Sequence, residues 1–180
     1  MSYLTQLALV LGLSMPGLAF AAGTEGGTPP ETTETTTKCK ASEVWDEKTS
    51  KCVDAQSGQL DNDTLFQAAR ELAYAGRPDD ALVVLAAMTE GESDRVLTYM
   101  GFANRKAGNL EAGLDYYHAA LALNPGNLLT RSYLGQAYVE MNEMELAQAQ
   151  LDEIVARGGA GGWPEQSLRK AIATGVTYSF

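Results

Sequence analysis

Residues 94–125 read DRVLTYMGFANRKAGNLEAGLDYYHAALALNP, and one feature of this stretch recurs along the chain at a nearly constant spacing. The feature is a small residue followed by a polar one. It occurs at Gly76-Arg77, Gly108-Asn109 and Asn142-Glu143, which are 32 and then 34 residues apart. Another small residue follows each pair, at Ala81, Gly113 and Ala147. A repeat of about 34 residues with small residues at these positions is typical of stacked helical hairpins.

The apolar residues between these marks recur at the spacing of one helix face. Asp61 or Asp63 can cap the first helix, and Pro78 suits the first turn of the second helix, where the missing amide proton needs no partner. We therefore expect an array of helical hairpins over residues 61–157. A capping helix over residues 163–175 should follow it.

A single hairpin is too thin to bury its own apolar face, so three of them must stack to share one core. Gly101 and Gly135 suit places where two helices cross too closely for a larger side chain. In the third hairpin we expect Leu146, Leu151 and Ile154 on the inner face.

The pattern resembles the tetratricopeptide repeat (TPR). The second repeat, residues 94–125, matches the family pattern at Leu97, Met100-Gly101, Tyr117, Ala120 and Pro125. The third repeat matches it at Leu134-Gly135, Tyr138, Ala147 and Leu151. The first repeat, residues 62–93, is weaker and has no closing proline, although it keeps Leu65, Ala69, Leu72, Ala81 and Leu85.

This resemblance implies an all-α fold: a right-handed α-solenoid of about three TPR hairpins plus a C-terminal capping helix, preceded by a small disulfide-pinned hairpin. The layout is similar to short secreted TPR proteins of Gram-negative bacteria. Two positions depart from the family pattern, Asn104 where the family has tyrosine and Arg131 where it has a large apolar residue.

The first 21 residues read as a secretory signal peptide. The stretch 4–13 is almost wholly apolar, and Ala19-Phe20-Ala21 supplies the small residues that signal peptidase reads. About ten apolar residues are too few to cross a bilayer, which needs about 20 in a helix. We expect cleavage, a mature chain that does not insert into the membrane and a periplasmic location, with an uncleaved tether as the alternative.

Between the signal and the array we expect a linker and a small hairpin. Residues 22–37 carry no large apolar side chain and are expected to form a disordered linker rich in Thr, Pro and Gly. In residues 38–54, Cys39 and Cys52 are expected to form a disulfide that pins a looped hairpin. Trp45 in that hairpin either packs over the disulfide or the first helix, or serves as an exposed aromatic anchor.

Charge and motif content exclude several functions. A net charge of −10 without a basic cluster argues against nucleic acid as a partner, because the protein would repel the phosphate backbone. Zinc requires about four closely spaced ligands, whereas His118 is the only histidine and the two cysteines pair with each other. We expect no enzyme activity and no catalytic, cofactor-binding or metal-binding residues.

By resemblance, the first helix of each hairpin lines a concave groove. The side chains expected to face a partner there are Phe66, Arg70, Tyr74, Arg95, Thr98, Phe102, Arg105, Ser132, Gln136 and Val139. Arginine can grip a carboxylate with two parallel hydrogen bonds. The sequence therefore favours a groove for a peptide of acidic or C-terminal carboxylate character, with solvated or core-shielding side chains as the alternative.

The leading hypothesis is a periplasmic TPR adaptor that binds a peptide segment of a protein partner during envelope assembly or quality control. The alternative is a non-catalytic module that recognises cell-wall glycan or peptide through the Trp45 hairpin. The tail, residues 176–180, ends Tyr-Ser-Phe and offers a further hypothesis, a signal for PDZ domains of envelope proteases. The partner's identity and the oligomeric state do not follow from the sequence.

Overall fold

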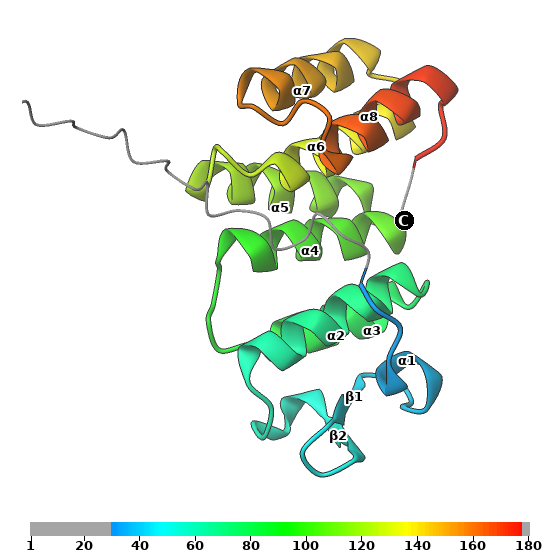
Figure 1. Ribbon diagram of the computed structural model, residues 1–180, viewed down its shortest axis with the longest axis vertical. Helices are drawn as coiled ribbons and strands as arrows, with labels where there is room; N and C mark the ends of the chain where they lie inside the picture. The colour runs from blue at the N-terminus through cyan, green and yellow to red at the C-terminus, as the bar shows by residue number, and fades with distance from the viewer. Residues whose placement is uncertain (1–29, 178–180) are drawn as a thin grey trace, which may run out of the picture.

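The computed structural model describes residues 30–177, which fold into a helical array with a small β-hairpin at one end (Figure 1). The elements are α1 (Glu34–Thr37), β1 (Glu43–Asp46), β2 (Lys51–Asp54), a 3-10 turn η1 (Ala55–Ser57), α2 (Asn62–Tyr74), α3 (Pro78–Ala86), α4 (Asp94–Lys106), α5 (Leu110–Leu123), α6 (Leu128–Glu140), α7 (Met144–Ala156) and α8 (Trp163–Thr174). The signal peptide expected at residues 1–21 and the final Tyr-Ser-Phe lie outside the described residues.

The recurring small-polar pairs of the sequence mark the ends of the first helix of each hairpin. Gly76, Gly108 and Asn142 all have left-handed backbone, with φ of 76°, 89° and 62°. Glycine adopts this conformation without strain, and asparagine tolerates it better than most residues. The period seen in the sequence is therefore the period of the turn between two antiparallel helices.

Side-chain caps fix where the first helices begin. The carboxylate of Asp61 accepts a hydrogen bond from the Thr64 amide at 2.8 Å, and the side chain of Asn127 accepts one from the Thr130 amide at 3.0 Å. Ser93 caps α4 in the same way. Pro78 lies in the first turn of α3, as expected.

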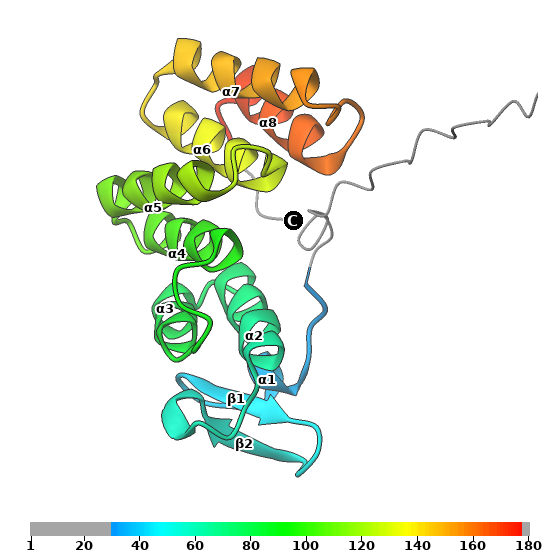
Figure 2. The same cartoon turned by 90° about the vertical axis from the view of Figure 1, so that its left-hand side faces the viewer.

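The hairpins α2–α3, α4–α5 and α6–α7, here called the first, second and third units, are piled in order along the long axis (Figure 2). Consecutive units contact each other through α2 with α4 and α4 with α6, and also through α3 with α4 and α5 with α6. Helix α8 packs on α6 and α7 and closes the far end. The predicted α-solenoid with a C-terminal capping helix is confirmed.

One prediction about the core of the third unit is wrong. Leu146 was expected on the inner face of α7 but is 46% exposed. The buried residues of that helix are Ala147, Leu151 and Ile154.

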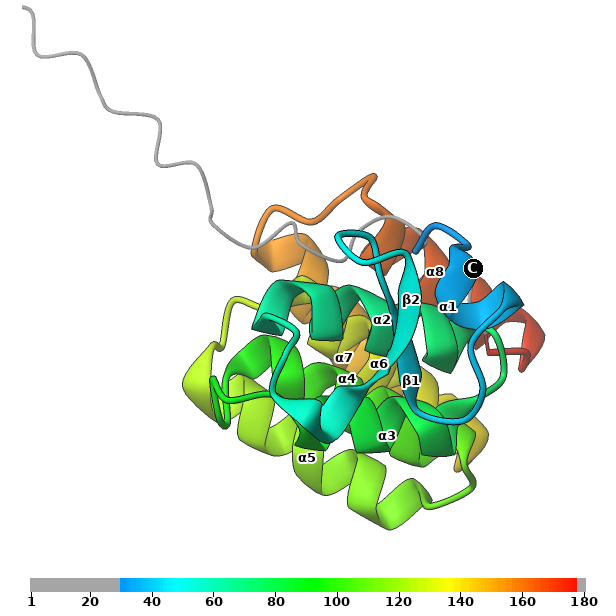
Figure 3. The ribbon, with the colours of Figure 1, turned by 90° about the horizontal axis from the view of Figure 1, so that it is seen from below.

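The N-terminal end is covered by the disulfide module, defined here as residues 30–57. Its strands pair antiparallel with Trp45 opposite Cys52, and Cys52 forms the predicted disulfide with Cys39. Val44 and Ala55 are buried in the same apolar cluster as the side chains of α2 and α3. Seen from below, the strands lie across the end of the array (Figure 3). The module therefore covers the apolar flank that the first unit would otherwise expose.

The prediction of a disordered linker over residues 22–37 is wrong for its second half, while residues 22–29 lie outside the described range. Residues 34–37 form the helical turn α1, and Thr35 is buried. The segment has no large apolar side chain to bury, but its threonines bind it to α2 through hydrogen bonds. Thr33 and Thr36 donate to the carboxylate of Glu71 on that helix. Hydrogen bonds to a charged acceptor are among the stronger ones in proteins.

Two helical glycines lie where neighbouring helices come closest, as the sequence predicted. A Cβ atom added at Gly101 would lie 2.6 Å from the ring of Tyr117 on α5. One added at Gly135 would lie 2.5 Å from a methyl carbon of Leu168 on α8. Both distances are far below van der Waals contact, so any larger residue would push the helices apart.

Gly101→Ala should therefore destabilise the protein, although alanine favours an exposed helix over glycine by about 1 kcal/mol. Overpacking against a buried ring typically costs about 1–3 kcal/mol, so we expect a lower midpoint of urea unfolding. The control is Gln148→Ala on the exposed face of α7, which removes only a solvent-exposed hydrogen bond to Asp152 and should leave the midpoint nearly unchanged. A midpoint for the Gly101 variant equal to or above that of the parent would contradict close packing at this crossing.

Candidate functional site

The ten side chains expected to line a groove lie mostly at the interfaces between successive units. Phe66, Thr98, Phe102, Ser132 and Gln136 have no exposed surface, and Arg70, Arg105 and Val139 are also buried. Only Tyr74 and Arg95 are half-exposed. The prediction that these residues face a partner is wrong for the buried ones, because α2 packs against α4, α4 against α6 and α6 against α8.

The interface between the first and second units is aromatic. The ring of Phe66 packs edge-on against Tyr99 with 5.3 Å between centroids, and the Arg70 Nε donates to the Tyr99 hydroxyl at 3.0 Å. Tyr74 stacks on Phe102 at 5.0 Å. These contacts join α2 to α4.

The same aromatic chain continues to the capping helix. Phe102 packs on Tyr133 at 4.8 Å, and Tyr133 meets Trp163 edge-on at 6.1 Å. The hydroxyls of Tyr74 and Tyr133 share a hydrogen bond that links the first unit directly to the third. Burial raises the pKa of Tyr133 well above its usual value, so its hydroxyl stays neutral.

Polar pairs tie the same helices together beside the aromatic chain. The hydroxyls of Thr98 and Thr130 are 2.6 Å apart, and those of Ser132 and Ser167 are 2.9 Å apart. Arg105 donates to the Glu140 carboxylate at 2.9 Å. The predicted groove residues thus hold α4 to α6 and α6 to α8.

The arginines expected to bind an acidic peptide have partners within the protein. Arg95 donates to Glu90 at 2.8 Å and to Asp63 at 2.9 Å. The hydrogen bonding of Arg95 to Glu90 is the main cause of a Glu90 pKa below its usual value. Arg70 donates to Gln67 at 2.7 Å, besides its bond to Tyr99. An acidic peptide would have to displace these internal acceptors.

An open cleft of about 770 Å³ lies instead between the disulfide module and α2. Its lining residues come from both parts: Pro30, Glu31, Thr33, Thr35, Val44, Trp45, Asp46, Glu47 and Lys48 from the module, and Asp63, Thr64, Gln67, Ala68, Arg70 and Glu71 from α2. This volume falls within the range of roughly 300–1,000 Å³ that is usual for ligand sites. Of the predicted groove residues, Arg70 alone lines this cleft.

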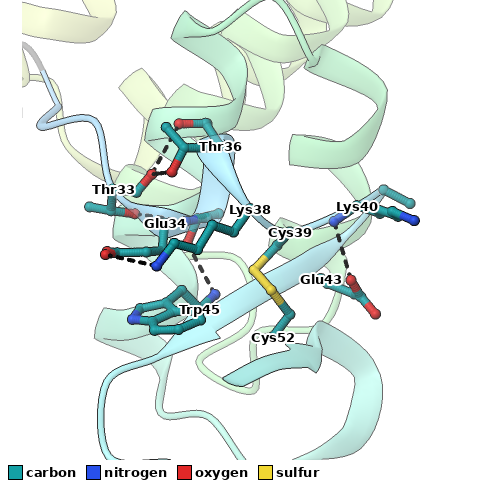
Figure 4. Close-up of a disulfide and its surroundings, with 12 residues drawn as sticks. Thr33, Glu34, Thr36, Lys38, Cys39, Lys40, Glu43, Trp45 and Cys52 are labelled. Atoms are coloured by element: carbon teal, nitrogen blue, oxygen red, sulfur yellow. Dashed lines mark hydrogen bonds and ion pairs between the residues drawn. A yellow bond between two sulfur atoms is a disulfide. The ribbon is translucent and has the colours of Figure 1, made fainter. Parts of the chain in front are cut away.

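Trp45 lines the module side of the cleft. Figure 4 shows its side chain near Lys38 and the Cys39–Cys52 disulfide. Its backbone amide donates to the Thr35 hydroxyl at 3.1 Å, and the Lys38 ammonium lies 4.9 Å from the ring centroid. The strand pairing places it opposite Cys52, beside the disulfide. Trp45 is half-exposed in the cleft, so its role as an aromatic anchor stays a prediction.

Residues 105–160 match the family model of the tetratricopeptide repeat. This part of the chain is made of tetratricopeptide repeats. The match covers the end of α4 and all of α5, α6 and α7, and the first unit continues the same hairpin geometry towards the N-terminus. Searches of curated proteins and of solved structures gave no significant match. Tetratricopeptide arrays generally serve as protein-protein interaction modules.

The structure explains the two departures from the TPR pattern. Arg131 donates to the carbonyl of Pro125 at 2.9 Å and to Gln150 at 3.0 Å, so it fastens the turn before α6 to α7. Asn104 bonds back to the carbonyl of Met100 within its own helix. Each polar side chain has its partner, and neither disturbs the register of the TPR units.

Sequence reasoning missed Glu71, which fixes the module to the TPR array. The Glu71 side chain is buried and accepts from the Thr33 amide at 2.7 Å and the Thr33 hydroxyl at 2.6 Å. Thr36 adds bonds from its amide and hydroxyl. The pairing spans 35–38 residues, so only the threonine-rich composition of the segment could have suggested it.

Glu71→Ala should release the segment around α1 from α2. Buried polar groups left without partners cost about 1–3 kcal/mol, so we expect lower stability in urea. Hydrogen-deuterium exchange should accelerate at Thr33 and Thr36. The control Glu111→Ala removes an exposed carboxylate from α5 and should change neither measurement. Unchanged exchange at residues 33–36 would show that Glu71 does not hold this segment.

Proposed function

We propose that this protein is a periplasmic TPR adaptor that holds a segment of a partner protein in the cleft between the disulfide module and α2. The TPR array supports a protein-binding role, and the predicted signal peptide and the disulfide support an exported location. A role in envelope assembly or quality control fits that location.

The observation that carries this proposal is the contrast between the cleft and the inner face of the array. The inner face uses its side chains to join the units, whereas the cleft is open and lined by exposed residues such as Glu47 and Gln67. Trp45 adds a half-exposed aromatic side chain, a residue type enriched in binding hot spots.

The repeat family supports a scaffold. Tetratricopeptide repeats are typically non-catalytic, so we propose a binding role. Among residues 30–177 no three metal-ligating side chains come together. No helix in the described range is long and apolar enough to span a membrane. His118 is exposed on α5 and lies 3.5 Å from the Tyr138 hydroxyl, away from the cleft.

Site-specific photocrosslinking in intact cells tests this proposal. A photoreactive phenylalanine analogue at Glu47 or Gln67 should give discrete adducts with a partner protein, because both side chains border the cleft. The same analogue at Gln148, on the exposed face of α7, should give none. Adducts from position 148 but not from the cleft, or no adduct at any position, would refute this binding site.

A second function, recognition of cell-wall glycan, is favoured by Trp45 itself. A half-exposed indole flanked by carboxylates offers a stacking surface and hydrogen-bond acceptors for a sugar ring. In this case Trp45→Ala should abolish co-sedimentation with purified wall material, whereas Trp45→Phe should retain part of it. The adaptor proposal predicts no co-sedimentation by the parent protein.

A further inference from the structure

We propose that the cleft takes a cationic segment, a short stretch of partner chain bearing lysine or arginine side chains. This inference rests on the proposed function and reverses the charge expected from the sequence. Five carboxylates line the cleft against two cationic side chains: Glu31, Asp46, Glu47, Asp63 and Glu71 against Lys48 and Arg70.

Two of the five carboxylates are free to bind a ligand. Glu31 and Glu47 are exposed, and neither has a hydrogen-bond or ion-pair partner in the described part of the chain. Asp63 is also open to solvent, with its side chain 81% exposed while it pairs with Arg95. An incoming cation would therefore meet two carboxylates, Glu31 and Glu47, that need not break bonds to described residues.

Asp46 is held as an ionised acceptor at the edge of the cleft. Its carboxylate accepts from the Thr49 hydroxyl at 2.7 Å and from the Lys48 amide at 3.0 Å. The Thr49 bond is the main cause of a pKa below the usual value of aspartate. Asp46 thus stays negative at neutral pH.

The two cations of the lining do not offset these charges at the open side. The Lys48 ammonium lies 3.8 Å from the Asp61 carboxylate, outside the lining, and its side chain is 84% exposed. Arg70 is buried in the wall and directs Nε to Tyr99 and Nη1 to Gln67. The open part of the cleft is therefore dominated by carboxylates.

Besides the carboxylates, Trp45 offers an aromatic face on which a ligand cation can pack. The molecule already places one ammonium group, that of Lys38, over this ring, and Lys38 is not part of the cleft lining. A ligand cation at the cleft side of the indole would make the same type of contact. Cation–π contacts of this kind are strongest with tryptophan.

Size and charge together define the ligand. The cleft volume of about 770 Å³ admits a short extended segment and not a folded domain. An acidic segment would meet carboxylates on both walls, and like charges at close range repel. A lysine-bearing segment fits both constraints.

Nuclear magnetic resonance of the two tryptophan indoles tests this inference. The probe is a synthetic ten-residue peptide of lysine, glycine and serine, and its partner probe carries glutamate in place of lysine. The lysine peptide should shift the indole resonance of Trp45 in a saturable way and leave that of Trp163 on α8 in place. The glutamate peptide should shift neither.

The variants separate a local site from the overall negative charge. Glu31→Gln with Glu47→Gln should weaken binding of the lysine peptide at least tenfold. Glu111→Gln with Asp115→Asn removes the same charge from exposed positions on α5 and should change the affinity less than twofold. Equal weakening by both pairs, no Trp45 shift, or tighter binding of the glutamate peptide would overturn the inference.

Failure of this inference differs from failure of the proposed function. Crosslinks from Glu47 or Gln67 to a protein, without lysine-peptide binding, would keep the adaptor and reject the cationic ligand. Saturable lysine-peptide binding without crosslinks in cells would establish the ligand chemistry and reject the proposed cellular role.

Discussion

The units of the array are joined by aromatic packing of α2 against α4, α4 against α6 and α6 against α8. The aromatic chain from Phe66 through Tyr99, Phe102 and Tyr133 to Trp163 crosses every interface between α2 and α8. A helical pair of about 30 residues cannot bury enough apolar surface alone, so the shared interior is what makes each unit stable. Stability is thus a property of the interfaces and not of single hairpins.

The inner face of the array is not available to a partner. Side chains such as Thr98 and Gln136 are buried between helices, where they join the units. The disulfide module then creates a new concave surface by packing its strands and threonine-rich segment against α2. The candidate site lies where two differently built parts meet, a frequent location for ligand sites.

Much of the fold was predictable because it follows from local chemistry. The turns at Gly76, Gly108 and Asn142, the Asp61 cap and the first-turn Pro78 each act within a few residues, so sequence spacing locates them. The second half of the linker was mispredicted because its partner, Glu71, lies at least 35 residues further along the chain. The groove was mispredicted because a position on the concave side of a helix was equated with exposure.

The sequence by itself determined the helical period, the crossing glycines and the cysteine pair, since these depend on backbone conformation and on covalent chemistry. Only the tertiary structure decided which of the predicted groove residues are buried and where an open cleft remains. The physical reason is that burial depends on how closely neighbouring helices approach, and that distance is set by side chains on both partners. The negative charge of the cleft likewise arises from Glu31, Glu47 and Asp63, which folding alone brings together.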